Sequence, residues 1–311
     1  MTAIRSSLKL PQSRAAKSGF SAPENRSDWS ESMRAPRTHE SPMPEKPTLT
    51  ATLQRAESGL DKDLRWAERG LDEAAIRRLA ARFDARAPEA LLEWALRRWG
   101  QRLMICTSFQ AGGVVIVDMA VRIEPSVRIV TLDTGRLPQE THDLIERVRE
   151  RYGVDVEMLF PDGRELGQML AANGPNFFYR SVEARLECCR VRKVEPLRKV
   201  LGEAAAWVTG LRRSQASSRA RVAKVALDHV HGGVVKLNPL ADWSDARVWA
   251  YIEEHALPYH DLYDRGYTSI GCAPCTRPVA PGAEARSGRW WWERCGPTEC
   301  GLHGSSARTG C

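Results

Sequence analysis

The sequence predicts an α/β protein built on a doubly wound, mainly parallel sheet. Between residues 102 and 160, short apolar runs of strand length alternate with longer segments whose apolar residues recur at helical spacing. Strands that alternate with helices in this way form a parallel sheet with helices on both faces. The composition agrees, because 42% hydrophobic and 27% charged residues in a chain of 311 are typical of a globular protein with a substantial core.

Two helices are predicted before the first strand. Apolar residues recur every three or four positions over 71–83 and again over 91–99, where Pro88 begins the second helix and Gly100 ends it. We then expect strands at 102–107, 127–132, 154–160, 207–210 and 234–237, and helices at 114–121 and 139–152. Ser244 is the expected N-cap of a last helix that runs to about His255.

The chain divides into three predicted parts. Residues 1–55 read as a disordered tail, since Ser, Pro, Arg and Glu dominate and apolar periodicity is lost. Residues 56–265 form the α/β nucleotide-binding domain, and 266–311 form a flexible, Cys-rich C-terminal arm. No apolar run has the length of a membrane span and the first twenty residues lack a secretory core, so we expect a cytoplasmic protein without a membrane partner. The early basic residues leave an organelle transit peptide as an alternative.

Charge restricts the partners only weakly. The formal net charge of +7 suits a nucleic acid, a small polyanionic substrate or a basic tail equally well. No RNA- or DNA-reading motif is present, so we expect no nucleic-acid partner.

Three loops follow predicted strands and together indicate a nucleotide site. They are 108–113, 133–138 and 210–215, and the carboxyl ends of parallel strands meet at one edge of a sheet. Glycines and a helix N-terminus in the first loop suit a phosphate or sulfate. In the second loop, Arg136 can make forked bonds to an anion, Asp133 can accept from a hydroxyl, and Gly135 permits an unusual φ. The candidate ligand-binding residues are Ser108, Phe109, Asp133, Thr134, Gly135, Arg136, Arg212 and Arg213.

Four of the eight cysteines form two close pairs, Cys188-Cys189 and Cys272-x-x-Cys275. Four thiolates suit zinc or an iron–sulfur cluster, and adjacent cysteines fit a cluster better than one tetrahedral ion. Buried free thiols and a redox disulfide are the alternatives. If the segment is helical, Lys193 lies one turn from Cys189, near enough to offset the charge of a cluster or to bind an anionic ligand.

A further cysteine, Cys300, lies among glycines beside His303. Such a thiol is well placed as a nucleophile that moves between a site and an outside partner. An unimportant tail thiol is the alternative.

Taken together, these motifs resemble the assimilatory adenylyl-sulfate (APS) reductases, the iron–sulfur branch of the phosphoadenylyl-sulfate (PAPS) reductase family. The matching segments run in the family's order from about residue 100 to 304: 107–109, 132–138, 188–193, 210–215, 239–243, 271–275, 289–293 and 299–303.

The resemblance implies an adenine nucleotide alpha hydrolase-like fold and a reaction in which APS and two thiols give sulfite and AMP, in sulfate assimilation for cysteine biosynthesis. By this resemblance, Cys300 would attack the sulfur of APS to form an S-sulfocysteine, and thioredoxin (or glutaredoxin) would release sulfite. The resemblance also implies a [4Fe-4S] cluster on Cys188, Cys189, Cys272 and Cys275 that does not carry the electrons, with Lys193 at the position paired with it. His303, Arg286 and Arg289 are expected to assist the thiolate and hold the anion.

Two features depart from the family pattern. The loop that commonly reads Ser-Phe-Gly-Ala-Glu-Asp has Gln110 in place of glycine and lacks both acids. Cys295 is an additional thiol, and we hypothesise that it forms a disulfide with Cys300. No role is predicted for Cys106 and Cys311, and the sequence gives no oligomeric state.

Several other functions remain open. They are a PAPS or dual APS/PAPS reductase, a nucleotide-dependent tRNA thiolase and a redox-sensing metal protein. The two cysteine pairs favour APS over PAPS, because the PAPS branch ordinarily lacks them.

Overall fold

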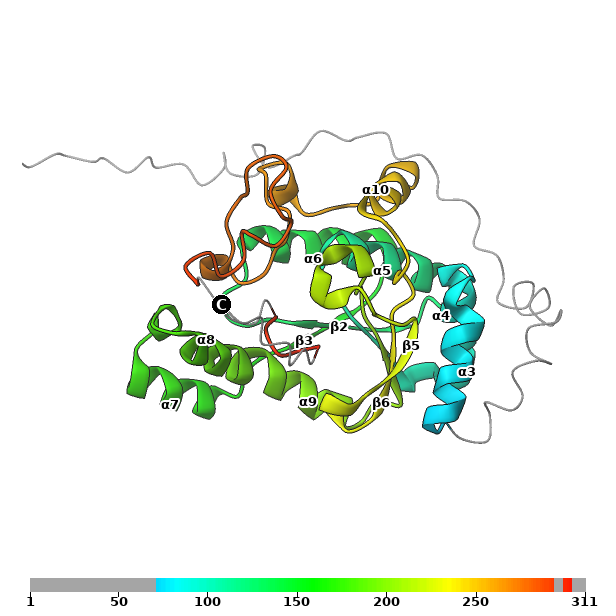
Figure 1. Ribbon diagram of the computed structural model, residues 1–311, viewed down its shortest axis with the longest axis horizontal. Coiled ribbons are helices and arrows are strands. Elements are labelled where there is room, and N and C mark those ends of the chain that lie inside the picture. Colours follow the sequence, from blue (N-terminus) through cyan, green and yellow to red (C-terminus); the bar gives the residue numbers. More distant parts are fainter. Residues whose placement is uncertain (1–70, 294–298, 304–311) are drawn as a thin grey trace, which may run out of the picture. The chain divides into compact units, whose positions relative to one another are not determined.

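A computed structural model describes residues 71–293 and 299–303. Its centre is a six-stranded sheet in the order β3-β2-β1-β4-β6-β5 (Figure 1). All neighbouring strands are parallel except β5, which pairs antiparallel with β6 at the edge. The strands are β1 Leu103–Cys106, β2 Arg128–Leu132, β3 Val156–Leu159, β4 Ala206–Val208, β5 Val225–Asp228 and β6 Val234–Leu237.

Helices lie on both faces of the sheet, as in a doubly wound fold. In Figure 1, α5 and α6 lie above the sheet and α7, α8 and α9 below it. The helices are α3 Glu73–Asp84, α4 Pro88–Trp99, α5 Ala111–Ile123, α6 Gln139–Tyr152, α7 Gly163–Asn173, α8 Val182–Cys189, α9 Glu195–Leu201 and α10 Asp245–Glu254. A large apolar core packs helices α3, α4, α5, α6 and α10 against one face of the sheet. A smaller core around Trp207 packs α9 against the other face.

The predicted ends of the helices are confirmed at several positions. Pro88 is the first residue of α4, and Gly100 follows it with a positive φ of 52°. Gly153 ends α6 in the left-handed conformation. The hydroxyl of Ser244 accepts a hydrogen bond from the backbone N–H of Arg247 at the start of α10.

The parallel sheet is confirmed, while β5 and α7 to α9 were not predicted. Strand β5 is only four residues long and is half-buried at an edge, so its apolar pattern is weak. Helix α8 passes through a π-helical turn, Arg190–Val194, into α9, and such a turn breaks the regular apolar spacing. No helix within the described ranges is long and apolar enough to cross a membrane. The predicted tail, Cys295 and Cys311 lie outside the described residues.

Candidate active site

The candidate site lies at the topological switch point of the sheet, where the order of the strands reverses. Strand β1 pairs with β2 on one side and with β4 on the other, so the loops that follow β1 and β4 diverge and leave space between them. A pocket with a volume of about 420 Å³ occupies this space, and this volume is in the range that binds small ligands. Segments from the C-terminal arm, including 268–271 and 299–303, complete its wall.

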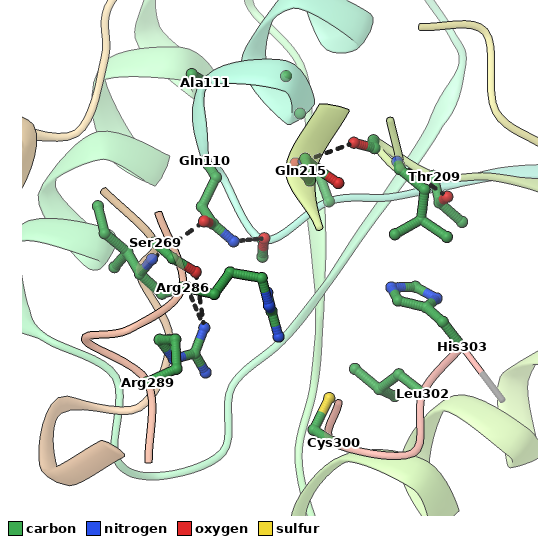
Figure 2. A pocket seen from close by; sticks show the side chains of 18 of the residues that line it. Gln110, Ala111, Thr209, Gln215, Ser269, Arg286, Arg289, Cys300, Leu302 and His303 are labelled. Atoms are coloured by element: carbon green, nitrogen blue, oxygen red, sulfur yellow. Dashed lines mark hydrogen bonds between the residues drawn. The ribbon is translucent and has the colours of Figure 1, made fainter. Parts of the chain in front are cut away.

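Most of the predicted ligand-binding residues line this pocket. They are Ser108, Thr134, Lys193, Arg212, Arg286, Arg289, Cys300 and His303. Figure 2 shows Arg286 and Arg289 on one side of the pocket and Cys300, Leu302 and His303 on the other. Three strand-end loops and the arm therefore meet at one cavity, as the sequence predicts.

The first loop is held tightly at the end of β1. The backbone of Phe109 adopts a φ of 53°, which is unusual for a residue with a side chain, and its N–H donates to the hydroxyl of Thr107 (3.0 Å). A Cβ at Gly113 would lie 2.3 Å from that hydroxyl, so only glycine fits. The ring of Phe109 is fully buried in the core and does not line the pocket, unlike the neighbouring Ser108.

Gln110, which replaces a glycine of the family pattern, links this loop to the C-terminal arm. Its side-chain oxygen accepts from the N–H of Ile270 (3.0 Å), and its amide donates to the hydroxyl of Ser108 (3.2 Å) (Figure 2). The departure from the family pattern thus adds a contact that joins two walls of the pocket.

The second loop places its polar side chains differently from our prediction. Asp133 accepts from the N–H of Gly135 (2.8 Å) and from His142 (3.0 Å), so the carboxylate shapes the loop and is not presented to the pocket. Gly135 supplies the expected positive φ of 67° but does not line the pocket. Arg136 donates to the carbonyl of Pro175 (2.5 Å) and lines the cysteine site instead.

The two adjacent arginines of the third loop have different roles. Arg213 donates to the carbonyl of Val222 (2.8 Å) and to Asp84 (2.5 Å), and it does not line the pocket. Arg212 is 5% exposed and lines the pocket, with one nitrogen bound to Asp245. Its buried Nε and Nη1 find no hydrogen-bond partner among the described residues. Buried donors without hydrogen-bond partners cost free energy, and an anion in the pocket could accept hydrogen bonds from both nitrogens. Arg212 is therefore a candidate anion-binding residue.

The pocket is strongly cationic. Five cationic side chains against two acidic ones give the lining a net charge of +3 if the imidazole is neutral. The cationic residues are Lys193, Arg212, Arg219, Arg286 and Arg289, and the acidic ones are Asp245 and Glu299. Such a lining favours a ligand with two or more negative charges.

Ion pairs beside Cys300 hold its segment in the pocket. Glu299 is 4% exposed and accepts two hydrogen bonds from Arg219 (2.7 Å each) and one from Arg286 (3.3 Å). Burial alone would raise the pKa of this carboxyl, but its hydrogen bonds to Arg219 lower the pKa below its ordinary value. On the other side, Arg185 donates to the carbonyl of Glu299 (2.8 Å). The sequence gives Arg219 no distinguishing motif, whereas Glu299 adjoins the candidate nucleophile.

His303 does not add positive charge near Cys300, contrary to our expectation. Its ring stacks on Trp207, with centroids 5.8 Å apart, and its Nδ1 lies 3.3 Å from Nζ of Lys236. Burial and the charges of Lys236 and Arg219 lower the pKa of His303 well below its usual value. The imidazole is therefore neutral at physiological pH.

The two cysteine pairs come together in a small neighbouring pocket. Cys188, Cys189, Cys272 and Cys275 all line it, as do Lys193 and Arg192 from the π-helical turn. Phe178 and Trp290 form an apolar cluster with Cys272 and Cys275, and Cys188 packs against it. Lys193 lines both pockets and so connects the cysteine site with the ligand site.

The surroundings of Cys272 favour the thiolate form of its side chain. The hydroxyl of Thr134 lies 3.2 Å from the sulfur of Cys272. Burial alone would raise the pKa of this thiol, but the charge of Lys193 and the hydrogen bond with Thr134 lower it. Within the described ranges, no three His, Cys, Asp or Glu side chains form a group that could hold a single metal ion.

Comparison with known proteins relates this chain to one family. Residues 102–278 match the phosphoadenosine phosphosulfate reductase domain. The chain is 47% identical over 201 residues to an adenosine 5'-phosphosulfate reductase of Allochromatium vinosum, covering 65% of this chain and 78% of that protein. It is 43% identical over 230 residues to one from Pseudomonas aeruginosa, covering 72% and 85%.

A solved structure shows the same fold. The crystal structure of a phosphoadenylyl-sulfate (PAPS) reductase from Candida auris, a phosphate complex, has a TM-score of 0.58 and 29% identity, and the match covers 68% of this chain and 98% of that chain.

Proposed function

Because the chain belongs to the phosphoadenosine phosphosulfate reductase family, we propose that it reduces adenylyl sulfate to sulfite and AMP in sulfate assimilation. The observation that carries the proposal is the position of Cys300 in the wall of a cationic, nucleotide-sized pocket at the switch point of the sheet. The substrate carries one negative charge on its phosphate and another on its sulfate, which suits the net charge of the lining.

The residues of the pocket divide between two anionic groups. The unpartnered nitrogens of Arg212, at the end of β4, suit the phosphate. Lys193, Arg286 and Arg289 suit the sulfate next to Cys300. A Cβ at Gly271 would lie 2.2 Å from the guanidinium of Arg289, so this glycine makes room for the arginine at the pocket wall.

The proposed reaction has two steps. The thiolate of Cys300 attacks the sulfur of adenylyl sulfate, an S–S bond forms, and the S–O bond breaks with its electron pair left on the phosphate oxygen of AMP. One thiolate of reduced thioredoxin (or glutaredoxin) then attacks Sγ of Cys300 and displaces sulfite, and its second thiol resolves the mixed disulfide. The oxidised reductant leaves, and Cys300 returns to the thiol. Such chemistry belongs in the cytoplasm, where thiols stay reduced.

The cysteine site fits an iron–sulfur group. Four buried or half-buried thiols share one pocket with cationic side chains that would offset the charge of a thiolate-bound cluster, and Thr134 provides a hydrogen bond to sulfur. Cys188, Cys189, Cys272 and Cys275 would hold a [4Fe-4S] cluster. When bound, the cluster supplies rigidity and fixed charge next to Lys193, and the electrons come from the thiol reductant.

Mass spectrometry tests the reaction. Protein incubated with adenylyl sulfate and no reductant should carry one SO₃ group on Cys300, and reduced thioredoxin should release it as sulfite. Cys300→Ser should carry none. Cys106→Ser is the matched control, because Cys106 lines the same pocket while burial raises the pKa of its thiol to about 12. An adduct that persists in Cys300→Ser, or a preference for PAPS in a parallel reaction, contradicts the proposal.

Metal analysis tests the cofactor separately. Anaerobically purified protein should contain iron and acid-labile sulfide, and Cys188→Ser should lose both, whereas Cys106→Ser should keep them. Zinc without sulfide in the wild-type protein would refute the cluster and leave the adduct test unaffected.

A further inference from the structure

Lys236 lies behind the pocket, where its ammonium group has three partners. It is buried in β6, and its Nζ lies 3.3 Å from Asp228, 3.3 Å from Nδ1 of His303 and 4.7 Å from the centre of the Trp207 ring. Burial lowers the pKa of Lys236 below its ordinary value, while Asp228 opposes this shift. The carboxylate and the aromatic face both favour the charged form of the lysine. Lys236 does not line the pocket, so it acts on a ligand only through another residue.

The contact with Lys236 determines which nitrogen of His303 carries the hydrogen. An ammonium group has three donors and no acceptor, so Nδ1 of His303 must accept the hydrogen bond. In a neutral imidazole the hydrogen is then on Nε2. Stacking on Trp207 fixes the plane of the ring. Nε2 has no hydrogen-bond partner in the part of the chain that the structure describes, and His303 lines the pocket (Figure 2).

We propose that Lys236 is a positioning residue that fixes His303 as the Nε2–H tautomer, so that the imidazole presents a donor, not a base, to the substrate beside Cys300. The inference rests on the proposed function. In the first step, the Nε2–H donates to the phosphate oxygen that receives the electron pair of the breaking S–O bond. The hydrogen stays on the imidazole, because the phosphate of AMP leaves as an anion. The donor therefore stabilises charge that develops in the transition state.

The tautomer can be read without any substrate. In protein labelled with ¹⁵N-histidine, the His303 signals, assigned by their loss in His303→Gln, should show a protonated Nε2 and an unprotonated Nδ1. In Lys236→Met the tautomers should mix, or the ring should titrate closer to its ordinary pKa of about 6.5. A protonated Nδ1 in the wild-type protein overturns the inference, and this result needs no variant to fold.

Kinetics provide the second readout. Lys236→Met should lower kcat at least about tenfold with little change in KM, because the donor acts in the transition state. Lys236→Arg keeps a charged donor and should retain most of the activity. Lys224→Met is the matched control, since Lys224 is equally buried and pairs with Asp242 (3.0 Å) outside the pocket.

The outcomes separate the two proposals. An equal loss of activity in Lys224→Met and Lys236→Met, or an unchanged tautomer in Lys236→Met, overturns the role of Lys236. Failure of the wild-type protein to form the SO₃ adduct refutes the proposed function, while the tautomer measurement still stands.

Discussion

The buried guanidinium of Arg185 should hold the segment that carries Cys300 in its place and stabilise the folded protein. This side chain is fully buried and makes two hydrogen bonds of 2.9 Å to Glu293 and one of 2.8 Å to the carbonyl of Glu299. It also lies over the ring of Trp290, 4.4 Å from its centre. Arg185 therefore joins α8, next to the cysteine pair, to the segment that carries Cys300.

Arg185→Met leaves the Glu293 side chain, which is 9% exposed, without its bidentate partner. Removing one partner of a buried ion pair costs about 3–5 kcal/mol, because the remaining charge stays desolvated. We expect a loss of this size in the free energy of unfolding, measured with urea and tryptophan fluorescence. Arg185→Met combined with Glu293→Met should cost less than the sum of the single changes by about 2–3 kcal/mol, as for residues in one network.

The chain offers a matched control at its surface. Arg128 makes two similar hydrogen bonds to Glu157, of 2.8 and 3.1 Å, but the Arg128 side chain is only half-buried and that of Glu157 is exposed. Arg128→Met should cost less than about 1 kcal/mol. If Arg185→Met costs no more than Arg128→Met, the assignment of Arg185 as a buried clamp is wrong.

Two further predictions concern packing and pH. Gly113→Ala should destabilise the protein by about 1–3 kcal/mol, because the added Cβ would lie 2.3 Å from the hydroxyl of Thr107. Gly163→Ala is the control, because a Cβ there would meet open space and should leave the stability unchanged. Equal melting temperatures of the two variants would contradict the predicted clash at Gly113. The pKa of Glu299 is lowered in the folded state, so its ion pair with Arg219 stabilises the protein above the unfolded pKa of about 4.5 and is lost as pH falls through the folded value. Urea titrations between neutral pH and this acid range should show a larger loss in the wild-type protein than in Glu299→Gln, and parallel curves would refute the pairing.

The sequence by itself determined the elements with strong local patterns. Buried strands of branched apolar residues, the Pro88 and Gly100 signals around α4, and the cap at Ser244 depend on neighbours along the chain, so they can be read from residues close together. The rule that strand ends share one edge of a parallel sheet also placed Thr134 and Arg212 at a common site.

Only the tertiary structure decided which polar side chain of each loop faces the pocket. Asp133 and Arg213 occupy the same loops as residues that line it, yet each is bound by neighbours from other elements, His142 and Asp84. Arg213 and Asp84 are far apart in the sequence, and although His142 lies only nine residues after Asp133 it belongs to the next helix, so no local pattern reveals either pair. The contact of Lys236 with His303 is of the same kind, because burial in three dimensions determines the strength of these interactions.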